Sequence, residues 1–383
     1  MLAAPLAFTL AACSSDGGPP MGPSGGVAST AGGGGGAPSG NASGGSQSAS
    51  GASGSNAGTP GDVAGSTSAG TSSAGAGGSG LGGVAGSGGT AGSLGADPTA
   101  GSAGAPTGMC PTTLPPLAAD GETAFYANRQ GIPHGVVKQV QYKAGVTKTM
   151  HVYTPPDYDT NTAASYPVLY INHGGGEDDH QWGCTDAYNC GYAGRILDNL
   201  LADGKAVPML IAMPDTGDCA SFTPPKPPTF DAPCTTQYVN DFIPYIEKTY
   251  RVKADRSSRA IAGLSMGGLV TLTTGFAHLE LFSHVFVYSS GYDAQTRPPW
   301  ETNLSSVLDD SHGTNHLLNA PIYLAAGATD IALQNAQAVR DIFEQHGIQV
   351  LWQDSSLGHE WANWRRYLAQ TLPLMFKNTA GCD

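Results

Sequence analysis

One ten-residue stretch narrows the folds open to this 383-residue chain more than any other, Arg259-Ala-Ile-Ala-Gly-Leu-Ser-Met-Gly-Gly268. A short apolar run leads into Gly263-Leu264-Ser265-Met266-Gly267, and an apolar helical pattern follows over 269–279. Glycines on both sides of a serine allow a sharp, strained turn between a strand and a helix. The pattern could be an ordinary turn in a chain with 55 glycines, but only this copy has the strand before it and the helix after it. It therefore predicts that Ser265 is an exposed nucleophile at a helix N-terminus.

A serine nucleophile needs a histidine base and an acid that orients the base, and both candidates come later in the chain. His359 follows the apolar run 348–353, and Asp330 follows the apolar run 321–326. The order serine, acid, histidine is the one found on sheets in which these groups follow successive strands. Asp330 is our first choice for the acid, and Asp354 and Glu360 are nearby alternatives.

The developing oxyanion needs two preorganised N–H donors. The backbone N–H of Met266, directly after the nucleophile, is one candidate. The second is expected in His173-Gly-Gly-Gly176, with Gly175 preferred and Gly176 as the alternative, because glycine lets the backbone approach the substrate closely. The adjoining Glu177-Asp-Asp-His180 could hold a metal, but we expect a solvated polar loop.

The rest of the second half of the chain alternates strand and helix patterns. Apolar runs typical of buried strands cover 166–172, 208–213, 284–288, 321–326 and 348–353, and helical patterns cover 193–201, 239–250, 332–346 and 361–376. Pro244 should kink the helix at 239–250 or mark its late start. An edge hairpin is expected over 136–142 and 147–153. Together these predict an α/β fold, with a mostly parallel sheet and helices on both faces.

The first 109 residues differ sharply in composition from the rest. No aromatic residue occurs between Phe8 and Phe125, and residues 14–109 are almost wholly Gly, Ser, Ala, Thr and Pro. Such a segment buries too little apolar surface to fold, so we expect a disordered tether before one domain over 110–383. Residues 1–13 end in Leu10-Ala-Ala-Cys13 after a short apolar run and predict a lipoprotein signal with Cys13 lipidated. A plain secretory signal with an incidental cysteine is the alternative. No Lys or Arg precedes the apolar run, which departs from the signal pattern and suggests a true start further upstream.

The balance of charges limits the expected partners. The chain has 17 basic and 30 acidic residues and a formal net charge of −13, without a basic stripe. This argues against nucleic acid and against an anionic membrane surface, so membrane contact is expected only through a lipid on Cys13. No metal-binding motif or cofactor fingerprint is present, and we expect no cofactor.

Six cysteines remain besides Cys13, and an even number in an exported chain suggests disulfides. Fifteen pairings are possible. Closeness in sequence favours Cys184–Cys190 and Cys219–Cys234, and Cys110–Cys382 would tie the two ends of the domain. The second pair would close a proline-rich insert as one wall of the substrate pocket, with Phe222 and Phe230 as contacts, or merely staple a surface loop.

Four segments occurring in order resemble the esterase D / feruloyl esterase group of the alpha/beta-hydrolase superfamily, which includes carbohydrate esterase family 1. They are His173-Gly-Gly-Gly176 with acidic residues and Trp182 after it, 241–250, 259–268 and Gly358-His-Glu-Trp-Ala-Asn-Trp364. The resemblance covers about residues 135–377. It implies a serine carboxylesterase with an alpha/beta-hydrolase fold that hydrolyses feruloyl or acetyl esters on plant polysaccharide, and Trp182 and Trp361 become candidate substrate contacts.

The resemblance leaves other functions open. Enterochelin-type esterases and acyltransferases share the fold, and a non-catalytic surface-binding module could be built on the same scaffold. The intact serine, acid and histidine order favours an enzyme. The signal and the tether together predict an exported protein on the outer membrane or the cell surface, or else a secreted one.

Overall fold

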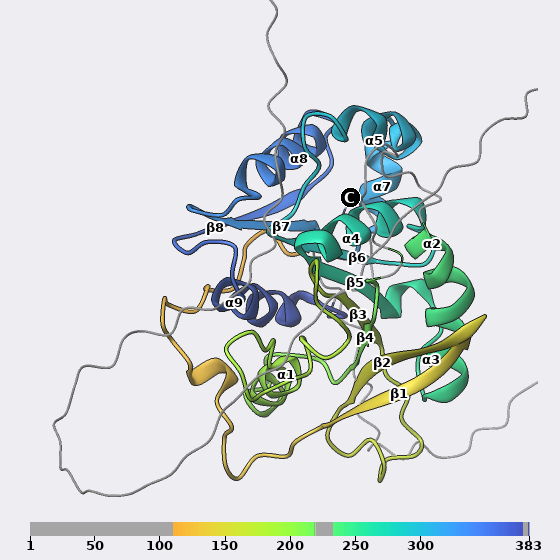
Figure 1. Cartoon of the computed structure of the whole chain (residues 1–383), viewed down its shortest axis with the longest axis vertical. Helices are drawn as coiled ribbons and strands as arrows, with labels where there is room; N and C mark the ends of the chain where they lie inside the picture. The colour runs from red at the N-terminus through yellow and green to blue at the C-terminus, as the bar shows by residue number, and fades with distance from the viewer. Residues whose placement is uncertain (1–109, 218, 220–232, 378–381, 383) are drawn as a thin grey trace, which may run out of the picture. The chain divides into compact units, whose positions relative to one another are not determined.

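The computed structural model describes residues 110–217, 219, 233–377 and 382 (Figure 1). The expected signal at 1–13 with Cys13, the expected linker at 14–109, and Phe222 and Phe230 lie outside the described residues. One 8-stranded sheet is present, with its strands in the order β1-β2-β4-β3-β5-β6-β7-β8. The strands are β1 (Val136–Ala144), β2 (Val146–Thr154), β3 (Val168–Asn172), β4 (Leu210–Pro214), β5 (Arg259–Leu264), β6 (His284–Tyr288), β7 (Ile322–Gly327) and β8 (Val350–Ser355).

The pairing of the strands confirms the expected mostly parallel α/β sheet. β1 and β2 form an antiparallel hairpin, and β2 pairs antiparallel with β4. All the remaining pairs, from β4 through β3, β5, β6 and β7 to β8, are parallel. The chain places β4 on one side of β3 and β5 on the other, so the strand order reverses there. Ligands of such sheets bind beyond the carboxyl ends of the strands at this reversal.

Helices cover both faces of the sheet (Figure 1). Their bounds are α1 (Ala193–Ala202), α2 (Pro233–Gln237), α3 (Ile243–Thr249), α4 (Ser265–Ala277), α5 (Arg297–Asn303), α6 (Ser305–Leu308), α7 (Ser311–Leu317), α8 (Leu333–Gln345) and α9 (Trp361–Thr371). Shorter turns are η1 (Ala124–Tyr126), η3 (Arg256–Ser258) and η4 (Leu372–Leu374), which are 3-10, and η2 (Tyr238–Phe242), which is a π-helix.

Two apolar clusters, one on each face, form the core. Alternate residues of β3 enter different clusters: Val168 and Tyr170 pack with residues of η2, α4 and α8, whereas Leu169 and Ile171 pack with residues of α1 and α9. The strand reads as a continuous apolar run because both of its faces are buried.

The helix expected over 239–250 is more complex than its pattern indicated. A π-helix, η2, joins α2 to α3, and the Ile243 N–H donates to the Tyr238 carbonyl five residues earlier. Pro244 then lies in the first turn of α3, where its missing N–H costs no helical bond. The late start is thus confirmed for α3, but helical turns continue on its N-terminal side.

The region 297–317 holds α5, α6 and α7, which the sequence analysis did not predict. These helices have only 4 to 7 residues and include proline, asparagine and serine. The C-terminal helix α9 ends at Thr371, earlier than the expected 376, and Pro373 lies in the 3-10 turn that follows.

Three disulfides join Cys110 to Cys382, Cys184 to Cys190 and Cys219 to Cys234. These are the pairings favoured above. Among the described residues, no helix has the length and apolar character needed to cross a membrane.

Candidate active site

Ser265 lies at the junction of β5 and α4, at the carboxyl end of the strand beside the reversal of strand order. Its φ of 51° is in the left-handed region, which non-glycine residues seldom adopt. The flanking glycines are needed for space: a Cβ on Gly263 would collide with the carbonyl of Gly267, and a Cβ on Gly267 would collide with the carbonyl of His173. The turn therefore holds the β5–α4 junction tightly against the end of β3.

A chain of hydrogen bonds connects Ser265 to the two later candidates. Ser265 Oγ lies 2.9 Å from His359 Nε2, and His359 Nδ1 lies 2.8 Å from Asp330 Oδ1. His359 is in the loop between β8 and α9, and Asp330 is in the loop between β7 and α8. Since these strands are parallel, both loops lie at the same edge of the sheet as Ser265. The three residues have the geometry of a nucleophile, a base and a group that orients the base.

The Asp330 side chain is fully buried and ionised. Burial disfavours the charge, but the His359 ring, the nearby Ser289 hydroxyl and the Ala332 N–H outweigh it, so the pKa of Asp330 is lowered. Ser289 Oγ also accepts a hydrogen bond of 2.9 Å from Trp364 Nε1. The sequence analysis missed Ser289, which follows β6 without any motif to mark it.

The two alternative acids are engaged elsewhere. Asp354 Oδ1 accepts from Trp352 Nε1 at 2.9 Å, and Glu360 Oε2 accepts from the Tyr188 hydroxyl at 2.5 Å. Neither carboxylate has a hydrogen bond to His359 among the described residues. The structure thus places Asp330, and not its two rivals, against the histidine.

The glycine loop after β3 faces the N-terminus of α4. A Cβ on Gly175 would collide with the side chain of Met266, so these two residues lie against each other. Gly174 is not available as a donor, because its N–H donates to Glu177 Oε2 at 2.8 Å. Gly176 takes a φ of 77° and makes the turn that reverses the chain. Of the three glycines, Gly175 is therefore the one that lies against Met266, and the N–H of Gly174 is already engaged.

Glu177 differs from the expected solvated loop. It is partly buried, and its Oε1 accepts from Trp361 Nε1 at 2.9 Å while Oε2 holds the N–H of Gly174. Burial raises the pKa of the Glu177 carboxyl, although these bonds oppose that effect. The carboxylate thereby ties the glycine loop to the start of α9, two residues after His359.

Trp182 and Trp361, the two candidate substrate contacts within the described residues, are corrected by the structure. Their exposed fractions are 1% and 4%, and their rings pack edge to face at 5.0 Å. Trp182 Nε1 donates to the Asn172 carbonyl at 3.0 Å, at the end of β3. Both indoles pack beneath the loops that carry the candidate site residues, and neither is accessible to a substrate.

His173 anchors the other side of the glycine loop. Its Nε2 accepts from the Thr216 N–H at 3.0 Å, and its Nδ1 lies 2.8 Å from the Gly174 carbonyl. Because a carbonyl only accepts, Nδ1 carries a proton. His173 thus joins the loops after β3 and β4.

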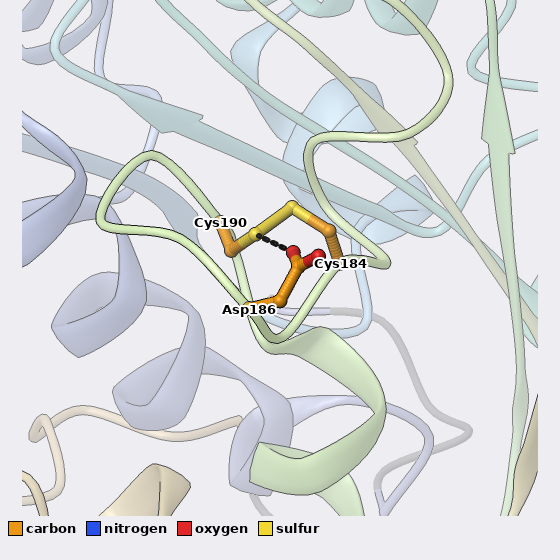
Figure 2. A group of neighbouring side chains, drawn as sticks. All are labelled: Cys184, Asp186 and Cys190. Carbon is orange, nitrogen blue, oxygen red and sulfur yellow. Dashed lines mark hydrogen bonds between the residues drawn. A yellow bond between two sulfur atoms is a disulfide. The ribbon is translucent and has the colours of Figure 1, made fainter.

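Cys184, Asp186 and Cys190 bring three groups that can bind a metal within 4.8 Å of one another (Figure 2). The two sulfurs form a disulfide, so neither can act as a thiolate ligand. The 3.4 Å approach of Cys190 Sγ to Asp186 Oδ1 is a close contact, since the oxidised sulfur has no proton to donate. The group closes a loop and is not suited to hold an ion.

Two cavities of about 270 Å³ lie beside α1, away from Ser265. Both are lined by Asp198, whose Oδ1 accepts from the Tyr153 hydroxyl at 2.6 Å and from the Gly135 N–H at 2.9 Å. Neither is lined by Ser265, His359 or Asp330, so we assign the site by the geometry of these three residues and not by cavity size.

Comparison with known proteins gives consistent results. A family model described as "Putative esterase" matches residues 144–375. An endo-1,4-beta-xylanase/feruloyl esterase of Xylanibacter ruminicola is 29% identical over 270 residues, which is 66% of this chain and 33% of the relative. The chain thus spans about a third of the length of this relative.

Two solved feruloyl or ferulic acid esterases are similar to the chain over nearly their full length. A ferulic acid esterase has 25% identity and a TM-score of 0.54, with 63% of this chain and 97% of that chain covered. The feruloyl esterase module from Clostridium thermocellum, complexed with sinapinate, has 19% identity and a TM-score of 0.56, with 69% and 95% covered. The second similarity concerns the fold alone.

Proposed function

Because the chain belongs to the Esterase family, in the feruloyl esterase group of the alpha/beta-hydrolase superfamily, we propose that it is an exported serine esterase of plant polysaccharide. The general reaction, hydrolysis of a carboxylic ester, follows from membership of the family. The acyl groups we propose are feruloyl or acetyl, and the acyl-enzyme forms on Ser265. The observation that carries the proposal is the hydrogen-bonded series Ser265, His359 and Asp330.

In the first half of the reaction, His359 Nε2 takes the proton of Ser265 as Oγ attacks the ester carbonyl carbon. The N–H groups of Met266 and Gly175 stabilise the oxyanion of the tetrahedral intermediate. The intermediate collapses when the bond to the alcohol oxygen breaks, and that oxygen receives the proton from His359. The sugar hydroxyl leaves, and the acyl group stays on Ser265.

In the second half, His359 deprotonates a water molecule that attacks the acyl carbonyl. Collapse releases the free acid and returns the proton to Ser265. Asp330 keeps Nδ1 of His359 protonated and stabilises the imidazolium that forms in both halves. Because Asp330 is buried and already ionised, it needs no rearrangement during the reaction.

The substrate assignment is supported by the relatives. A curated relative is named as a xylanase and feruloyl esterase, and a solved structure of 25% identity is named as a ferulic acid esterase. The three disulfides of the described domain suit an exported protein.

We further propose the domain organisation expected above: a lipoprotein signal at 1–13, a flexible linker at 14–109 and an esterase domain at 110–383. A lipid on Cys13 would hold the enzyme at the outer membrane or cell surface, and the linker would let the domain reach an insoluble polymer. Mass spectrometry of the mature N-terminus should find an acylated Cys13. An unmodified N-terminus at another residue would contradict the anchor and leave the esterase proposal intact.

The activity is tested with a panel of esters and the purified full chain. We expect hydrolysis of methyl ferulate, of p-nitrophenyl acetate and of a feruloylated arabinoxylan oligosaccharide, with the free acid as product. Adding a competing alcohol distinguishes hydrolysis from acyl transfer, because a transferase would form a new ester. A chain that cleaved none of these esters would contradict the proposed function.

A further inference from the structure

The Cys184–Cys190 disulfide closes a short loop (Figure 2). This loop carries one exposed aromatic side chain, Tyr188. Tyr188 is 66% exposed, while other large aromatic side chains near the triad, such as Trp182 and Trp361, are buried. Its hydroxyl donates to Glu360 Oε2 at 2.5 Å, and Glu360 directly follows His359 in the chain. The tyrosine is therefore hydrogen-bonded to the residue that directly follows the proposed base.

Tyr188 is held in place in spite of its exposure. Arg365 Nη1 donates to the carbonyls of Tyr188 and Cys190, both at 2.8 Å, from a guanidinium that is almost completely buried. The same guanidinium lies 5.7 Å from the centre of the Tyr188 ring and also stacks on Tyr126 and Tyr192.

The ends of the loop are fixed as well. Gly191 N–H donates to the Gln181 carbonyl at 2.6 Å, and the Tyr192 N–H donates to the Cys184 carbonyl at 3.2 Å. An exposed ring fixed by a disulfide, a buried arginine and a carboxylate loses little conformational entropy when a ligand packs against it.

We propose that Tyr188 forms a binding subsite for a sugar ring of the polysaccharide, on the alcohol side of the scissile ester. The proposal rests on the polysaccharide esterase function given above. A polymer cannot be enclosed, so its sugars must lie on exposed surface, and Tyr188 is exposed. A feruloyl ring, being flat, aromatic and terminal, would instead favour an enclosed slot.

The chemistry around Tyr188 fits a sugar. The ring face offers apolar surface for the C–H face of a pyranose or furanose. Glu360 Oε1 accepts from the Gly358 N–H at 3.3 Å and Oε2 from Tyr188, and each carboxylate oxygen can accept a further bond from a sugar hydroxyl. A neutral sugar requires a stacking surface beside oxygens that can accept a further hydrogen bond, and Tyr188 with Glu360 offers both.

The test compares two substrates that share the feruloyl group. With Tyr188→Ala, we expect KM for a feruloylated arabinoxylan oligosaccharide to rise about 3- to 10-fold, the loss of one aromatic stacking contact. For methyl ferulate, which has no sugar, kcat and KM should stay within about twofold. Tyr188→Phe keeps the ring and should retain most of the affinity for the oligosaccharide.

Val146→Ala, at a similarly exposed residue of the β1–β2 hairpin, is the matched control and should leave kcat and KM unchanged for both substrates. If the wild type were active and Tyr188→Ala left KM for the oligosaccharide unchanged, the proposed sugar subsite would be refuted. The proposed esterase function would not be affected by that result. An equal loss on methyl ferulate would place Tyr188 at the acyl group and also overturn the assignment. A wild-type chain inactive on both substrates would overturn the function, and the subsite with it.

Discussion

The sharpest distinction that the structure makes at single residues is between Asp330 and Asp354. Asp330 Oδ1 lies 2.8 Å from His359 Nδ1, whereas Asp354 accepts from Trp352. Asp330→Asn should lower kcat on methyl ferulate by on the order of 10³–10⁴-fold, because the amide can no longer hold the productive tautomer of His359. Asp354→Asn is the matched control and should keep kcat within about twofold. The reverse pattern would contradict the assignment of the acid.

His284 gives the domain a dependence on pH that is separate from catalysis. Burial, with a smaller contribution from Arg256, lowers the pKa of His284 to about 3, and its Nε2 accepts from the Phe376 N–H at 3.3 Å. The unfolded chain binds a proton near pH ~6.5, whereas the folded chain does not until about pH 3. The free energy of unfolding should therefore fall by up to ~1.4 kcal/mol per unit as the pH is lowered through this window.

Urea unfolding at several pH values measures this slope. His284→Asn removes the titrating group and should make the slope shallower, while the exposed His312→Asn should leave it nearly unchanged. Equal slopes for wild type and His284→Asn would show that another group causes the dependence on pH.

At the scale of elements, the central contact is the one between the start of α4 and the end of β3. A Cβ on Gly267 would meet the backbone carbonyl of His173, which cannot move without displacing the glycine loop. Gly267→Ala should therefore lower kcat by at least ~10²-fold and destabilise the fold by about 1–3 kcal/mol. Gly275→Ala, on the same helix, meets only side chains of Val285 and Ile261 and should cost less. Equal kinetics for Gly267→Ala and wild type would refute this contact.

Much of the arrangement of elements was predictable from sequence. Parallel strands buried on both faces appear as continuous apolar runs, and loops after successive parallel strands meet at one edge. The positions of Ser265, Asp330 and His359 after strands therefore predict a common site, and the structure brings the three within hydrogen-bonding distance.

The features that the sequence did not predict depend on the direction in which each side chain points in the folded domain. Trp182 and Trp361 stand in sequence beside candidate site residues, but only packing shows that both indoles are buried. Ser289 is hydrogen-bonded to Trp364, and Tyr188 is hydrogen-bonded to Glu360. The partners in each pair are far apart in the sequence, so no local sequence pattern indicates these contacts. The helices α5 to α7 are too short for a periodic pattern to stand out.

At the scale of the whole domain, the Cys110–Cys382 disulfide joins residues 272 positions apart. Cys382 also donates its N–H to the carbonyls of Asn315 and Leu318, just before β7, at the end of the sheet opposite Asp330. Replacing both cysteines by serine should lower the free energy of unfolding by about 2–5 kcal/mol. Activity at low temperature should be retained, because the link is remote from the triad. Chemical denaturation measures the first effect, and an unchanged midpoint would contradict it.

The account depends most on Ser265 being the nucleophile, and covalent labelling measures this directly. A fluorophosphonate should add one adduct per chain, which peptide mass spectrometry should locate on Ser265. His359→Ala should slow the labelling strongly, because the hydroxyl then lacks its base, and Ser265→Ala should abolish both the adduct and ester hydrolysis. An adduct on another residue, or a Ser265→Ala chain that still cleaves methyl ferulate at the wild-type rate, would contradict the account.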